Sequence, residues 1–185
     1  MPSDRPRLPT TRRRLLAGAG MGLALWLAGC SLSPASGGPP YAVHELDDGP
    51  VFGPGLQDER EHAVYAGLVV AASGLDAFDR ERLTDAAADF LDATDFADQY
   101  LAVVQVSAVP ASMVGSVPDV AESDTNCTVV ASLDSHTPAS DEQVVTTLLV
   151  RVTAQHRAPP ETVRLELHID DQHRTASGDR VTSGG

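Results

Sequence analysis

The chain has 185 residues, and its 13 basic side chains are outnumbered by 26 acidic ones, which gives a formal net charge of −13. All the basic residues are arginine, most acids are aspartate, and only 4% of the residues are aromatic. A surface with this excess of acids repels nucleic acid and anionic lipid. The small number of aromatic rings excludes a surface on which bases or sugars stack.

Residues 1–29 have the features of an export signal. Five arginines precede an uncharged run of 15 residues from Leu15 to Gly29, which is broken by three glycines. A membrane-spanning helix needs about 20 apolar residues, whereas a signal peptide needs fewer. We therefore predict a signal peptide, with an uncleaved anchor helix as the alternative.

The motif TRRRLL at residues 11–16 resembles the twin-arginine export signal, with Arg12 and Arg13 as its arginine pair. It departs from the family pattern by having Leu15 where Phe is favoured. The lysine-free, aspartate-rich composition also resembles that of proteins from salt-loving archaea, in which high salt screens the repulsion between acids. Both resemblances imply an exported haloarchaeal protein.

The motif LAGC at residues 27–30 matches the lipobox of lipoprotein precursors at every position. The resemblance implies cleavage after Gly29 and a lipid on the sulfur of Cys30. The protein would then be held at the extracellular face of the cell membrane. From Cys30 onward the chain has eight arginines and 25 acids, a net charge of −17.

The rest of the chain is predicted as one domain with flexible ends. Residues 30–59 comprise the lipidated cysteine and a Ser-, Pro- and Gly-rich tether, and residues 171–185 are a polar disordered tail. Between them, residues 60–170 form a single domain. Its predicted elements are a strand at 62–73, a helix within 75–96 capped by Asp79 or Thr84, and strands at 100–109, 127–133, 144–153 and 162–170, with a loop at 110–124.

This order of elements predicts an α+β fold. The loops between the later strands are too short for crossover helices, which favours a small antiparallel sheet with the helix packed on one face. An all-β sandwich is the alternative.

Residues 94–168 resemble the C-terminal domain of PrcB, a β-rich module of exported lipoproteins. The resemblance rests on the sequence TDF at residues 94–96 followed by the hydrophobic strand YLAVVQ at 100–105. The chain lacks the glycine-rich turn expected after that strand. The resemblance implies binding to a protein partner rather than catalysis.

Two further motifs give candidate sites in the domain. In the strand at 127–133 the alternating pattern points Cys127 inward, and Asn126-Cys127-Thr128 matches an N-glycosylation acceptor with Asn126 outward. Near the C-terminus, His168, Asp170 and His173 are candidate metal ligands, although a polar strand face followed by an acidic loop explains the same pattern.

No nucleophile motif, phosphate loop or dinucleotide fingerprint occurs in the sequence, so we predict neither catalysis nor a cofactor. The leading hypothesis is a non-enzymatic, lipid-anchored envelope protein that binds a partner protein, with its membrane contact through the lipid on Cys30. The alternative is an ion-binding protein or metal-dependent enzyme that uses His168, Asp170 and His173.

Overall fold

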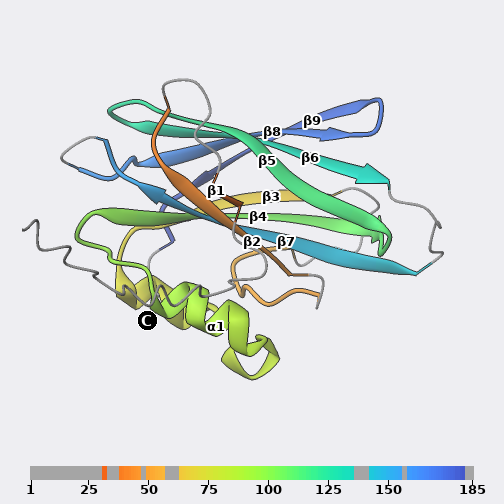
Figure 1. The fold of residues 1–185 in the computed structure, drawn as a ribbon, viewed down its shortest axis with the longest axis horizontal. Coiled ribbons are helices and arrows are strands. Elements are labelled where there is room, and N and C mark those ends of the chain that lie inside the picture. Colours follow the sequence, from red (N-terminus) through yellow and green to blue (C-terminus); the bar gives the residue numbers. More distant parts are fainter. Residues whose placement is uncertain are drawn as a thin grey trace, which may run out of the picture.

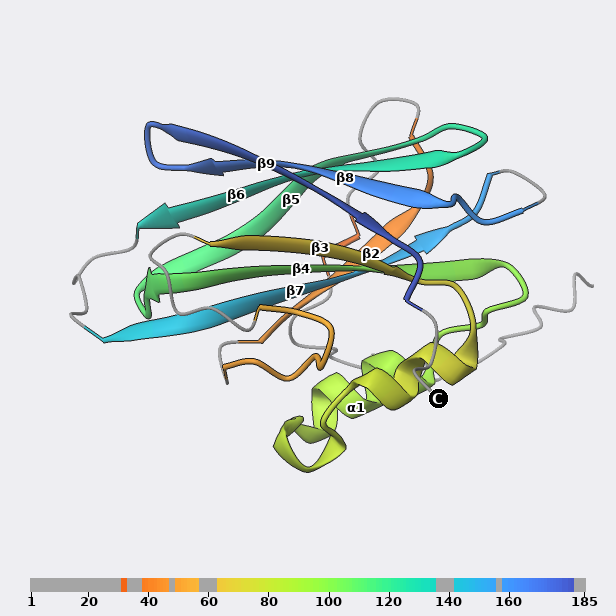
Figure 2. The ribbon, with the colours of Figure 1, turned by 180° about the vertical axis from the view of Figure 1, so that it is seen from behind.

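The computed structural model describes residues 31–32, 38–46, 49–56, 63–135, 142–155 and 158–181. These residues form three layers: a four-stranded sheet, a five-stranded sheet and a layer of short helices and loops (Figures 1 and 2). The first two layers pack face to face as a β-sandwich. The third covers the outer face of the five-stranded sheet.

The five-stranded sheet is antiparallel throughout. Its strand order is β1-β2-β7-β4-β3, with β1 at Ser31–Leu32, β2 at Tyr41–Leu46, β7 at Gln143–Thr153, β4 at Gln99–Pro110 and β3 at Val64–Val69. Strands β4 and β7 are apolar on both faces because both faces of this sheet are covered. The predicted strands at 62–73, 100–109 and 144–153 are thus confirmed.

The four-stranded sheet has the order β5-β6-β8-β9. The strands are β5 at Met113–Glu122, β6 at Asn126–Ser135, β8 at Thr162–Ile169 and β9 at Gln172–Asp179. Strands β6 and β8 run parallel, because β7 lies between them in the chain and belongs to the other sheet. The alternating burial of β6 and β8 places apolar side chains inward and polar ones outward, as their sequences predict.

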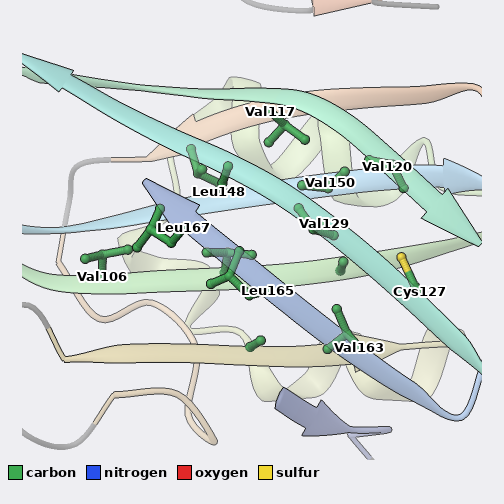
Figure 3. Packing of buried hydrophobic residues seen from close by; sticks show 14 of the residues in the cluster. Val106, Val117, Val120, Cys127, Val129, Leu148, Val150, Val163, Leu165 and Leu167 are labelled. Carbon is green, nitrogen blue, oxygen red and sulfur yellow. The ribbon is translucent and has the colours of Figure 1, made fainter. Parts of the chain in front are cut away.

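The main hydrophobic core lies between the two sheets (Figure 3). Cys127, Val129 and Leu133 of β6 and Leu165 of β8 are fully buried there. The inward orientation predicted for Cys127 is therefore confirmed. Burial of this apolar surface is the chief stabilising term of the sandwich, at about 25 cal/mol per Å² removed from water.

Contacts between the sheets close both sides of the sandwich. On one side the Tyr41 hydroxyl donates a hydrogen bond to the carbonyl oxygen of Val117 (2.8 Å), and the Gly115 N–H donates to Glu45 Oε1 (2.6 Å). On the other side β9 crosses β3 so closely that a Cβ on Gly178 would overlap a backbone carbonyl of β3. These contacts tie the two sheets together along both sides of the sandwich.

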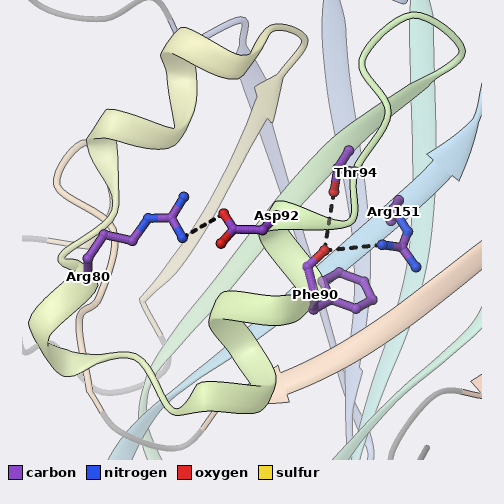
Figure 4. A network of polar contacts seen from close by, with 5 residues as sticks. All are labelled: Arg80, Phe90, Asp92, Thr94 and Arg151. Carbon is purple, nitrogen blue, oxygen red and sulfur yellow. Dashed lines mark hydrogen bonds and ion pairs between the residues drawn. The ribbon is translucent and has the colours of Figure 1, made fainter. Parts of the chain in front are cut away.

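The helical layer contains two 3-10 helices, Ala72–Ala77 and Arg80–Arg82, and the helix α1 at Asp85–Asp92. The Thr84 side chain caps α1 by accepting a hydrogen bond from the N–H of Ala87 (3.2 Å). Of the two predicted caps, Asp79 and Thr84, the structure thus confirms Thr84 for this helix. Arg151 of β7 anchors the other end of the helix. Its guanidinium lies 4.5 Å from the centroid of the Phe90 ring and donates to the Phe90 carbonyl oxygen (3.1 Å; Figure 4).

The α+β prediction is wrong: the fold is an all-β sandwich with one short α-helix in the described residues, the architecture considered as the alternative. The prediction failed because the helix covers only one face of the five-stranded sheet. A second sheet covers the other face, and β5 and β9 of that sheet come from segments expected to be irregular.

Three predicted boundaries also differ from the structure. The expected loop at 110–124 contains β5, the expected tether at 30–59 contains β2, and the expected tail at 171–185 contains β9. In β5, Pro118 lies where the pairing with β6 is interrupted between Ser116 and Asp119, so its missing N–H costs no ladder hydrogen bond. The packed domain therefore extends beyond 60–170 at both ends.

Candidate functional site

A cavity of about 510 Å³ opens in the helical layer, on the outer side of the five-stranded sheet. It is formed where the segment before β3 meets the turn between the two 3-10 helices. Its lining residues are Pro50, Val51, Phe52, Gly53, Leu56, Asp76, Ala77, Phe78, Asp79 and Val145.

Backbone pairing between two loops builds the cavity. Phe52 and Phe78 form an isolated antiparallel bridge, supported by hydrogen bonds from the Gly53 N–H to the Ala77 carbonyl oxygen (2.8 Å) and from the Asp79 N–H to the Val51 carbonyl oxygen (2.9 Å). The two phenylalanine rings lie 4.7 Å apart and are buried. The pairing thus gives the cavity a fixed apolar wall.

The floor of the cavity is tied to the centre of the sheet. The Leu56 N–H donates to Gln105 Oε1 of β4 (3.0 Å), and Gln105 Nε2 donates to Thr147 Oγ1 of β7 (3.1 Å). Gly55 lies against the Gln105 amide so closely that a side chain there would overlap it. These bonds satisfy a fully buried amide and hold the loop in place.

Two carboxylates lie at the rim of the cavity. Asp79 Oδ1 accepts a hydrogen bond from the N–H of Glu81 (3.2 Å), whereas Asp76 is an exposed residue at the end of the first 3-10 helix. An apolar wall with negative charges at its rim fits a ligand that has an apolar body and a cationic end. The sequence interpretation missed this site, although the Gly- and Pro-flanked phenylalanine in GPVFGPG at residues 49–55 indicates a built turn.

The structure brings two of the three candidate metal ligands together. His168 and His173 are directly opposite one another on β8 and β9, with ring centroids 4.9 Å apart. Asp170 lies in the turn, where its Oδ1 accepts a hydrogen bond from Ser135 Oγ (3.3 Å). The described residues contain no group of three or more His, Cys, Asp and Glu side chains that could hold a metal ion.

A buried polar cluster at one end of the sandwich was also missed. The Tyr100 hydroxyl and Glu122 Oε1 are buried and make no hydrogen bond of standard geometry, and both lie near the Cys127 thiol. Burial raises the pKa of Cys127 to about 11 and raises the pKa of Tyr100 well above its ordinary value. The Tyr100 hydroxyl lowers the pKa of Cys127, whereas the Glu122 carboxylate raises it. A thiol with such a high pKa is a poor nucleophile at neutral pH.

The glycosylation motif lies at the start of β6 with its amide engaged. Asn126 Nδ2 donates to Thr128 Oγ1 (3.0 Å), and Asn126 Oδ1 accepts from Thr162 Oγ1 (3.1 Å). Glycosylation would replace one of the two Nδ2 hydrogens and leave one that can donate to Thr128. Glycosylation of Asn126 stays a prediction.

The export and lipidation residues Arg12, Arg13, Gly29 and Cys30 lie outside the described residues. In the part of the chain that the structure describes, no helix is long and apolar enough to cross a membrane. No protein-family model, curated protein or solved structure matches the chain. The resemblances to haloarchaeal lipoproteins and to the PrcB C-terminal domain therefore stay predictions.

Proposed function

We propose that this chain is a lipid-anchored, extracytoplasmic binding module whose cavity takes a basic, partly apolar segment of an envelope protein. The observation that carries the proposal is the cavity itself: a fixed apolar wall of paired loops with Asp76 and Asp79 at the rim. The lipobox at residues 27–30 supports the anchor.

Binding accounts for the cavity better than catalysis does. Among the described residues that line it, the ionisable groups are two carboxylates, with no histidine, cysteine or arginine. Cys127, the nucleophile of highest intrinsic reactivity in the described part, is fully buried in the sandwich core instead. Nucleophilic chemistry needs a thiolate that a substrate can reach, whereas Cys127 is fully buried and its pKa is raised to about 11.

Thiol-directed photo-cross-linking in native membranes tests the proposal. An Ala77→Cys variant places a single reactive thiol in the cavity lining and keeps both carboxylates, because Cys127 is buried and the sulfur of Cys30 is proposed to carry lipid. The thiol is labelled with a benzophenone maleimide. The parent protein is the labelling control, and Thr175→Cys on exposed β9 is the positional control.

We expect Ala77→Cys to give one dominant cross-linked protein that Thr175→Cys does not give. In a parallel affinity capture, Asp76→Lys should lose that protein, whereas Asp89→Lys, an equal charge change on exposed α1, should retain it. Identical products from both cysteine positions, or no product from either, would refute the proposal. Labelling of the unmodified parent at Cys30 would show that this residue carries no lipid.

A further inference from the structure

The exposed ends of β8 and β9 bring two imidazole rings together on the outer face of the four-stranded sheet. His168 and His173 are cross-strand partners in this hairpin, and both are exposed. We propose that these two histidines form a binding site for a divalent late-transition metal ion, with Cu²⁺ bound most tightly. The site is independent of the cavity proposed above, which lies in the opposite layer.

The separation of the rings suits a shared ion. An imidazole nitrogen binds such metals at about 2.0 Å, so two rings on one ion have centroids about 4.5 Å apart at a right angle and about 5.1 Å apart at the tetrahedral angle. The observed separation of the His168 and His173 centroids is 4.9 Å, between these two values. A metal ion can therefore bridge the two rings without a change in the register of the strands.

The hairpin holds the two histidines in place before any metal binds. Backbone pairing continues from His168–His173 to Ile169–Gln172, and the turn residues Asp170 and Asp171 close the hairpin. Asp170 adopts a positive φ of 47°, which Asp tolerates better than most residues. Prior ordering of both ligands reduces the entropic cost of binding.

The surrounding charges favour a cation. Asp170 and Asp171 are both exposed in the turn next to the rings. The nearest arginines along the two strands are engaged elsewhere: Arg164 pairs with Glu166 (3.4 Å), and Arg174 donates to Gln172 Oε1 (2.9 Å). Because Asp170 is itself bonded to Ser135, we assign two protein ligands and leave the remaining coordination positions to water.

Cu²⁺ is the most informative probe, since it is the tightest binder of the divalent series and its paramagnetic resonance spectrum reports nitrogen ligation. The full-length protein, purified in detergent with a histidine-free tag and stripped of metal, is titrated with Cu²⁺. We expect one site with two nitrogen ligands. His168→Gln or His173→Gln should weaken binding at least tenfold, because one ligand cannot chelate.

The matched control uses the neighbouring outward pair on the same two strands. In this pair, Thr175→Ala changes the residue opposite Glu166, keeps the Arg164–Glu166 ion pair, and should leave the Cu²⁺ affinity unchanged. Equal affinity in the wild type and in both histidine variants would overturn the proposal. So would an equal loss of affinity in the control.

A second measurement uses the wild-type chain alone. Diethyl pyrocarbonate modifies accessible imidazoles, and peptide mass spectrometry follows each of the six histidines separately. We expect bound Cu²⁺ to protect His168 and His173 together. Protection of a different histidine, or of neither member of the pair, would contradict the assignment.

Discussion

The buried thiol of Cys127 predicts that the protein loses stability in mild alkali. Cys127 is fully buried between the sheets, and burial is the main cause of its raised pKa, with the nearby Glu122 carboxylate acting in the same direction. Ionising this thiol in the folded state would place a negative charge in the core. Unfolding exposes the thiol to water, where it ionises at its ordinary pKa.

The sign and the magnitude follow from proton linkage. Between the ordinary pKa of 9.0 and the folded-state value of about 11, the unfolded chain binds fewer protons than the folded one. The free energy of unfolding is therefore unaffected below pH 9 and falls as the pH rises through this window. Two pKa units correspond to a total loss of about 3 kcal/mol from Cys127.

The composition makes this window unusually clear. The chain contains no lysine, and arginine stays protonated throughout. The pKa values of Tyr65 and Tyr100 are raised by burial from 10.0, so these residues add a further loss of stability, but only above about pH 10. Between pH 9 and 10 the fall in the free energy of unfolding is therefore assigned chiefly to Cys127.

Urea unfolding at pH 8, 9, 10 and 11 at constant ionic strength measures the effect. Cys127→Ala should have a lower free energy of unfolding at pH 8, because it leaves a cavity, but a nearly flat profile between pH 9 and 10. Tyr100→Phe should show the wild-type decrease in the free energy of unfolding between pH 9 and 10. Above pH 10 its decrease should be smaller than that of the wild type. Parallel losses in the wild type and Cys127→Ala between pH 9 and 10 would refute the reasoning.

Three further substitutions test the anchor and the fold. Cys30→Ser should move the protein from the membrane to the soluble fraction or stop its processing. Stable anchoring needs lipid chains, and serine has no sulfur to form the thioether that carries them. Normal processing and membrane retention of Cys30→Ser would contradict this. Gly178→Ala should destabilise the domain by about 1–3 kcal/mol in urea unfolding through overlap with β3, whereas Gly53→Ala, whose nearest contact would be 3.4 Å, should not. Thr84→Ala should cost about 1 kcal/mol by removing the cap of α1, and Thr84→Ser should restore most of it.

The sequence predicted the elements whose pattern of apolar residues matches their burial. β6 and β8 alternate because one face is in the core and the other in solvent, and β4 has apolar residues on both faces because both are covered. The strands that escaped prediction lie toward the sheet edges. β9 has no buried residue, and β5 contains Pro118 and Gly115, which normally indicate a turn.

The two candidate sites also differ in how far the sequence could predict them. His168, Asp170 and His173 were predicted as candidate ligands because they lie in one short segment, with His168 and Asp170 expected on the same strand face. The structure instead brings His168 opposite His173 across a hairpin, a pairing that was not predicted from the sequence. The cavity was not predicted, because its two loops are more than 20 residues apart in the chain and meet only through the Phe52–Phe78 bridge. Local periodicity contains no information on such a contact.

The arginines in the described part of the chain are engaged by groups of the chain itself. Each described arginine makes a polar contact within the chain. Arg80 pairs with Asp92 and Arg164 with Glu166. The others donate to neutral oxygens: Arg82 to Pro50, Arg151 to Phe90, Arg174 to Gln172, and Arg180 to Pro159 and Pro160. A partner at the cavity must therefore supply the cations itself. In molar salt the screening length is about 3 Å, so only contact-range charges still act. We expect Asp76→Lys to abolish capture of the partner even in molar salt, whereas any small effect of the distant Asp89→Lys should disappear there.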